Sequence, residues 1–129
     1  MRKIKLLHTV VRVGSGGVEQ RRLSLAKHLD REVFEQRLIC SDSFGGLPSE
    51  LERAGCLVHE VGVLKHPFDP APHARVLKVI QEFKPDIIHG AVFEGLSFAA
   101  VAGRLGRVPI IIGEETSDPL HRRWSGHLF

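Results

Sequence analysis

The sequence is poor in cysteine and in aromatic residues, and it contains no long apolar run. Only two of its 129 residues are cysteines, tyrosine is absent, and aromatic residues make up 6%. Basic residues are interspersed with acidic ones to a net charge of +3. With few rings for base stacking and no basic stripe, the composition does not favour a nucleic-acid partner. Since no stretch approaches the roughly 18 apolar residues of a membrane-spanning helix, we expect any membrane contact to be peripheral.

The start of the chain and its two cysteines indicate a cytoplasmic protein. Met1-Arg2-Lys3 is followed by only a short apolar run without a small-residue cleavage site, so a secretory signal is not expected. Cys40 and Cys56 lie in apolar surroundings on what should be separate strands. Reduced core thiols are the usual state in a cytosolic α/β protein. We therefore expect two free thiols and no disulfide.

Short apolar runs alternate with amphipathic segments up to about residue 113, a pattern typical of βαβ units on a parallel sheet. The apolar runs predict five strands, over residues 4–11, 36–41, 57–61, 86–89 and 109–113. The last of these is apolar enough to predict a strand buried on both faces. Helical spacing predicts four helices, over residues 18–29, 48–54, 70–84 and 94–105. With no repeat or linker between them, we interpret residues 1–129 as a single domain.

The predicted topology places a ligand site at one edge of the sheet. Because parallel βαβ connections are right-handed, we expect the strand order 3-2-1-4-5, numbered along the chain. The fold class is then a Rossmann-like three-layer α/β/α domain. Ligands bind such sheets where the carboxyl ends of the strands open, between the first and fourth strands. The segments expected at this edge are residues 11–19, 42–47, 89–95 and 113–118.

The first predicted helix has an apolar and a charged side. We expect the apolar stripe to face the sheet and the charged residues, Arg22 among them, to lie opposite. The stripe is Val18, Leu25, Ala26 and Leu29, and the charged side is Glu19, Arg22 and Lys27.

Glycines separate the first strand from this helix. Gly14, Gly16 and Gly17 lack the Cβ atoms that would block close approach, and a helix start offers unpaired N–H groups, so a phosphate is favoured there. A tight connection without a ligand is the alternative. A dinucleotide-binding fingerprint is excluded because Glu19 stands where its third glycine is required. A P-loop is excluded because no Gly-Lys-Ser/Thr triplet occurs.

These residues resemble glycosyltransferase family 4. The strings Gly16-Gly17-Val18-Glu19 and Leu25-Ala26-Lys27-His28-Leu29 are similar to that family's "GGxE…LAxxL" start. The segment Lys84 to His89, with the residues from Ala99 to Ile111, is similar to its "PDIIH…AARLxGVPxI" segment. The resemblance covers nearly the whole chain.

The resemblance implies one half of a GT-B fold. It implies the acceptor-side, amino-terminal domain of a retaining enzyme that transfers a sugar from a nucleotide-sugar to a glycan or lipid-linked acceptor. The donor-binding carboxy-terminal domain would lie outside the chain, so the chain would be truncated and inactive alone. No cofactor is implied besides the nucleotide-sugar substrate, and we expect no metal ion because no histidine pair has a recognised ligand spacing. The implied location is the cytoplasm, with peripheral contact to the inner face of the plasma membrane left open.

The resemblance also assigns residues to the cleft, with Gly16 and Gly17 on its donor side and Glu94 as a candidate catalytic residue on its acceptor side. By position, the backbone of Gly16 and Gly17 would contact the donor diphosphate. His89 would lie in the cleft, although a strand-end histidine bonded to backbone is the alternative. Ala91 stands where many family members have a second histidine near the reacting sugar, and Glu94 is then the nearest ionisable residue. Its alternative role is a favourable acidic residue in a first helical turn.

Two further groups of residues have both a functional and a structural interpretation. Glu114 and Glu115 follow the fifth strand, where they would bind acceptor hydroxyls or accept a proton, or else face water. The string from His121 to Trp124 suits a membrane surface or an acceptor phosphate, or else a helix packed on another part of the protein.

Two other classes of protein stay open. One is a stand-alone ligand-binding or regulatory domain similar to a flavodoxin-like receiver, although such a receiver needs aspartates where this chain has His8, Thr9 and Arg12. The other is a different GT-B enzyme, such as a sugar epimerase.

Overall fold

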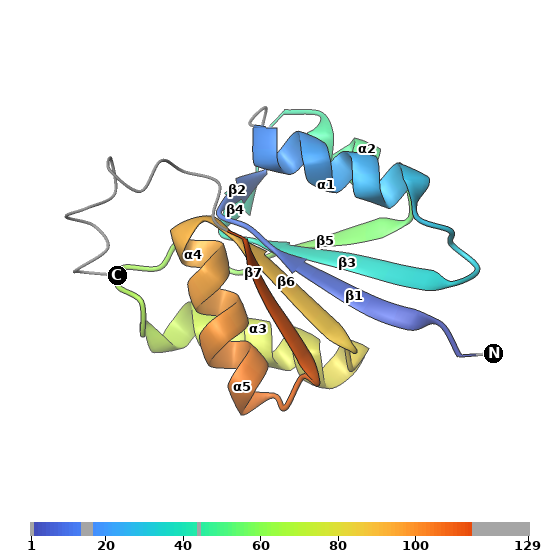
Figure 1. Ribbon diagram of the computed structural model, residues 1–129. Coiled ribbons are helices and arrows are strands. Elements are labelled where there is room, and N and C mark those ends of the chain that lie inside the picture. The colour runs from blue at the N-terminus through green and yellow to red at the C-terminus, as the bar shows by residue number, and fades with distance from the viewer. Residues whose placement is uncertain (1, 14–16, 44, 115–129) are drawn as a thin grey trace.

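The computed structural model describes residues 2–13, 17–43 and 45–114, and it forms three layers (Figure 1). A five-stranded sheet lies in the middle. One face carries α1 (Gly17–His28) and α2 (Leu47–Arg53). The other face carries α3 (Pro70–Phe83) and a continuous helical run composed of α4 (Val92–Ser97), the π-helical turn η1 (Phe98–Ala102) and α5 (Gly103–Leu105).

The sheet has the order β5-β3-β1-β6-β7, and its four strand pairs are parallel. The strands are β1 (Ile4–Thr9), β3 (Phe34–Cys40), β5 (Cys56–Glu60), β6 (Ile87–Ala91) and β7 (Ile110–Glu114). This confirms the predicted order 3-2-1-4-5 and the Rossmann-like fold. A short parallel pair, β2 (Arg12–Val13) with β4 (Asp42–Ser43), was not predicted and lies beyond the carboxyl ends of β1 and β3.

Two apolar clusters attach the helices to the sheet, one on each face. Because strand side chains alternate between faces, neighbouring residues of β3 belong to different clusters: Ile39 packs with α3 and η1, whereas Leu38 packs with α1 and α2. Both cysteines lie in the second cluster as free, buried thiols, as expected. Desolvation raises the pKa of Cys40 and of Cys56 to about 12, so neither is a reactive thiolate.

Small residues allow the helical run after β6 to approach the sheet closely. A Cβ atom on Gly103 would lie 3.1 Å from Cγ2 of Ile88, and Ala99 and Ala102 are buried. Ala100, on the other side of the run, is exposed. The run begins at Val92, two residues before the predicted start at Glu94.

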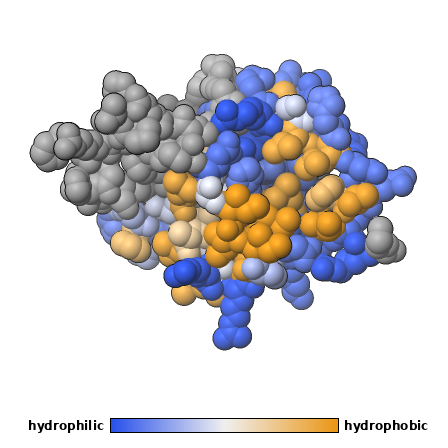
Figure 2. Space-filling model, in the orientation of Figure 1, coloured by the Kyte–Doolittle hydropathy of each residue, from blue (hydrophilic) through white to orange (hydrophobic). Residues whose placement is uncertain are grey.

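The burial of β7 differs from the prediction. Ile110, Ile111 and Ile112 are 50%, 38% and 43% exposed, so the strand is not buried on both faces. Within the described chain β7 pairs with β6 alone, which makes it an edge strand. Figure 2 shows hydrophobic surface gathered in the middle of the face on which Figure 1 shows β7 in front. The apolar sequence identified the strand correctly, but tertiary neighbours decide its burial.

Among the described residues, no helix has the length and apolar character that a membrane crossing requires.

Candidate functional site

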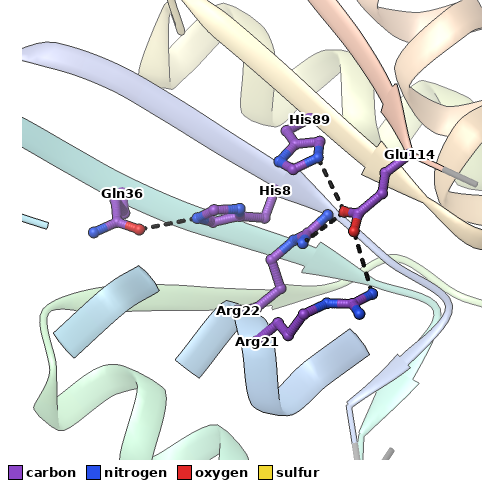
Figure 3. Close-up of polar contacts among 6 residues, drawn as sticks. All are labelled: His8, Arg21, Arg22, Gln36, His89 and Glu114. Carbon is purple, nitrogen blue, oxygen red and sulfur yellow. Dashed lines mark hydrogen bonds and ion pairs between the residues drawn. The ribbon is translucent and has the colours of Figure 1, made fainter. Parts of the chain in front are cut away.

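Charged and polar side chains from several elements meet at the carboxyl edge of the sheet, on the face covered by α1 (Figure 3). They come from β1, β3, β6, β7 and the first half of α1, so segments far apart in sequence build the cluster. The residues drawn are His8, Arg21, Arg22, Gln36, His89 and Glu114, of which the hydrogen-bonded pair His8 and Gln36 lies deeper in the sheet, away from its carboxyl edge. The edge is the one predicted for ligand binding, because the strand order reverses at β1.

Glu114 is the centre of this cluster. Its Oε2 atom lies 3.1 Å from Nη1 of Arg22 and 3.1 Å from Nε2 of His89, and its Oε1 atom lies 3.2 Å from Nη2 of Arg21. Glu114 is the last residue of β7 and is in register with Ala91 at the end of β6. Parallel pairing thus brings the end of the fifth predicted strand beside the fourth and opposite α1.

The deepest member is Arg22, whose side chain is only 1% exposed. Its Nη1 group donates a hydrogen bond to Glu114, whereas its Nε and Nη2 groups are buried and have no hydrogen-bond partner in the described part of the chain. Desolvation lowers the pKa of Arg22, and the charge of Glu114 opposes that shift. A guanidinium keeps its charge under such a shift, so its uncompensated N–H groups are costly.

The position of Arg22 corrects the sequence analysis, which placed this residue on the outer side of α1. The burial of Arg22 could have been predicted from its position in the helix. Val18, Arg22, Leu25 and Leu29 follow one another in steps of four, three and four, which places Arg22 on the same side of the helix as the apolar residues. Arg22 therefore interrupts the apolar stripe. A basic residue inside an apolar helical stripe indicates a buried acidic partner or an anionic ligand.

The environment of Glu114 keeps its carboxylate ionised. Desolvation acts to raise its pKa, but the charge and hydrogen bond of Arg22, with His89 and Arg21, outweigh it and lower the pKa. A carboxylate with a lowered pKa is a weak proton acceptor. Glu114 is thus better suited to orienting basic groups than to accepting a proton.

The two histidines of the cluster are held in the neutral form. His8 and His89 are register partners on β1 and β6, with ring centroids 6.3 Å apart. Desolvation, helped by the charge of Arg22, lowers the pKa of His89, and Glu114 opposes this shift. A neutral imidazole at position 89 donates through Nε2 to the carboxylate of Glu114, the arrangement in which a histidine is oriented by an acidic residue.

The structure brings together only some of the predicted site residues. His89 and Glu114 are in contact, and Gly17 begins α1 at the same edge of the sheet. Glu94 lies partly buried in the first turn of α4, and within the described residues no hydrogen bond or ion pair joins it to the cluster. Gly16, Glu115 and the string from His121 to Trp124 lie outside the described residues.

The backbone after β6 is strained. Val92 has φ of +66°, a left-handed conformation that a β-branched residue rarely adopts. Such a conformation costs on the order of 1–3 kcal/mol and is typical of functional sites. Val92 follows Ala91, whose side chain is fully buried in the cluster with α1 and α2. The position where many members of the family have a second histidine is therefore filled by a core methyl group.

Among the described residues, no three histidine, cysteine or acidic side chains are placed to hold a metal ion together. The candidate site is instead a cluster of two guanidinium groups and a histidine around one carboxylate, so its chemistry is that of binding and positioning charged groups.

The fold defines a Rossmann-like α/β domain, and the charged cluster lies at the β1/β6 switch, where the sequence predicts a ligand. The family model for the glycosyl transferase 4-like domain matches residues 16–129, and the chain belongs to that family. The capsular polysaccharide biosynthesis glycosyltransferase CapH of Staphylococcus aureus is 28% identical over 89 residues. That match covers 69% of this chain and 24% of CapH.

Two solved structures share the fold. A glycosyltransferase from Rickettsia africae matches 97% of this chain with a TM-score of 0.68 and 21% identity. A Listeria monocytogenes protein described as a putative UDP-N-acetylglucosamine 2-epimerase matches 98% of it with a TM-score of 0.56 and 18% identity. The chain spans 34% of each of these structures and about a quarter of CapH.

Proposed function

We propose that the chain is the acceptor-side, amino-terminal domain of a GT-B glycosyltransferase that transfers a sugar, with retention, from a nucleotide-sugar to a glycan or lipid-linked acceptor. The family match over residues 16–129 carries this proposal. CapH, which is named for capsular polysaccharide biosynthesis, supports a saccharide acceptor. The charged cluster at the β1/β6 switch supports a ligand at this edge.

In this proposal a second domain, outside these 129 residues, binds most of the donor. The chain supplies the opposite wall of the cleft, where the backbone of Gly16 and Gly17 contacts the donor diphosphate and His89 faces the reacting sugar. The enzyme works in the cytoplasm, with peripheral membrane contact when the acceptor is lipid-linked. We expect no metal requirement, so dialysis against a chelator should leave the rate unchanged.

The acidic residues take different roles. Glu114 orients Arg22 and His89, because a carboxylate with a lowered pKa is a poor base. Glu94 has no ion pair within the described chain and lies beside the strained Val92, so it is the stronger candidate for a direct contact with the acceptor hydroxyl.

Sugar transfer by the complete enzyme that contains this chain tests the proposal. UDP- and GDP-hexoses are incubated with an oligosaccharide or a polyprenyl-linked acceptor, products are detected by mass spectrometry, and the anomeric configuration is read by NMR. Glu94→Gln should lower kcat by about 10²-fold if Glu94 transfers a proton. Glu82→Gln, on the exposed end of α3, is the matched control and should leave kcat unchanged.

Two results would contradict the proposal. Formation of an epimerised UDP-sugar without transfer to any acceptor would favour the epimerase alternative. Transfer by the 129-residue chain at the rate of the complete enzyme would refute the assignment of the donor site to a second domain.

A further inference from the structure

We propose that Arg22, Arg21 and His89 form a binding site for a phosphate group of a substrate, and that the carboxylate of Glu114 occupies this site until the phosphate displaces it. The three basic groups come from α1 and β6 and converge on the two oxygens of Glu114 at 3.1–3.2 Å (Figure 3). Convergent guanidinium and imidazole N–H donors are the arrangement that binds an oxyanion.

The buried guanidinium has donors that Glu114 does not use. Arg22 gives one N–H group to the carboxylate, and its Nε and Nη2 groups have no partner among the residues that the structure describes. A side chain that is 1% exposed cannot satisfy these groups with bulk water. A phosphate offers more acceptor oxygens than a carboxylate, so it can occupy donors that Glu114 leaves unpaired.

The charge of the cluster also favours a more highly charged anion. Two arginines face one carboxylate while His89 is held neutral, which leaves an excess of one positive charge among these groups. A phosphate monoester, or the two phosphates of a nucleotide-sugar together, carries about two negative charges at neutral pH and would balance both arginines.

The site can be reached from its outer side. The side chains of Glu114 and Arg21 are 29% and 54% exposed, whereas Arg22 lies beneath them. Glu114 is the last residue of β7 and its side chain is partly exposed, so the proposed displacement requires a change of its rotamer and no change in the pairing of the strand.

The identity of the substrate that carries this phosphate is inferred from the proposed function. It is either the diphosphate of a nucleotide-sugar or the phosphate of a lipid-linked acceptor, and both present the same oxyanion to Arg22. Phosphate binding is measured without sugar transfer, so this inference and the proposed function can fail separately.

Titration of the chain with inorganic phosphate tests the site, using NMR signals of the Arg22 Nε–H group and the His89 ring. Glu114→Gln removes the competing charge and should bind phosphate about tenfold more tightly than the wild-type chain. Asp86→Asn makes the same charge change at an exposed ion pair with Arg2, at the opposite edge of the sheet, and should leave the affinity unchanged. Equal affinities in Glu114→Gln and Asp86→Asn would overturn the inference.

Removal of the donors gives the converse test. Arg22→Gln in the Glu114→Gln background should weaken phosphate binding about tenfold or more, because a charge-assisted hydrogen bond is lost. Should that variant not fold, Arg21→Gln alters an exposed side chain and must still weaken binding. Retained affinity in the folded variants refutes the site. The same titration with UDP and with geranyl phosphate then distinguishes the two sources. Tighter binding of UDP would assign the site to the nucleotide-sugar, and tighter binding of geranyl phosphate would assign it to the lipid-linked acceptor.

Discussion

His8 is a fully buried imidazole in the middle of the sheet, and its surroundings permit only the neutral form. Its Nε2 group lies 2.9 Å from Oε1 of Gln36, whose amide nitrogen donates to the carbonyl of Leu25. Nε2 is therefore the protonated nitrogen. Desolvation, helped by the charge of Arg22, lowers the pKa of His8 from 6.5 to about 3, whereas the hydrogen bond to Gln36 opposes the shift.

This burial predicts an acid-sensitive fold. Between pH 6.5 and about 3 the unfolded chain binds a proton at His8 that the folded chain does not, so stability is full above pH 6.5 and falls as the pH drops. His8→Gln should reduce the loss of unfolding free energy between pH 7 and pH 5 by about 2 kcal/mol. Urea unfolding at the two pH values measures this. His28→Gln, at an exposed position of α1, is the control, and an equal effect there would contradict the assignment to His8.

At the scale of elements, the contact between β1 and α4 depends on the absence of a side chain. Gly95 is buried against the end of β1, and a Cβ atom there would lie 2.5 Å from the carbonyl oxygen of Thr9. The hydroxyl group of Thr9 donates a hydrogen bond of 2.7 Å to the carbonyl of Gly95. Because the obstructing atom belongs to the backbone of the central strand, the neighbour cannot move aside cheaply.

Gly95→Ala should therefore destabilise the domain although alanine is the better helix former. The helix preference of alanine is worth about 1 kcal/mol, and the forced shift of α4 should exceed it, for a net loss of about 1–3 kcal/mol. Thermal unfolding measures the loss. The matched control is Gly46→Ala, since Gly46 precedes α2 with nothing within 4 Å of a Cβ and a φ of −92°. A stable Gly95→Ala protein would mean that α4 does not pack this closely.

At the scale of the whole molecule, the β7 edge of the sheet presents apolar side chains to solvent. The edge formed by β7 carries Ile110, Ile111 and Ile112 on a strand that pairs on one side only within the described chain. Leu105 and Phe68 add exposed apolar surface, being 67% and 71% exposed. An exposed, apolar edge strand is a site for association.

We expect the isolated 129-residue chain to associate as its concentration rises. Ile112→Lys should shift the sedimentation profile toward the monomer, because a charge on an edge strand opposes pairing. Gln81→Lys adds the same charge on the exposed surface of α3 and should not change association. An identical shift in both variants would assign the effect to net charge rather than to the β7 edge.

The architecture could be predicted from the sequence because its signals are local. Apolar runs, helical spacing and the boundaries set by glycine and proline located all five strands of the main sheet and the helices to within a few residues. The right-handed crossover rule then gave the strand order. The same order predicted that the segments of His89 and Glu114 lie at one edge of the sheet, whereas the contact between the two side chains comes from the tertiary structure.

The sequence alone thus determined the succession of elements, because each element is marked by the periodicity of neighbouring residues. The crossover rule then determined the parallel strand order and the edge at which the charged residues gather. The tertiary structure decided the burial of Arg22, the contact of its guanidinium with Glu114 and the exposure of β7. These three features depend on contacts between residues far apart in the chain, and Arg22 and Glu114 are separated by 92 positions. Local periodicity carries no information on which distant partner a side chain contacts.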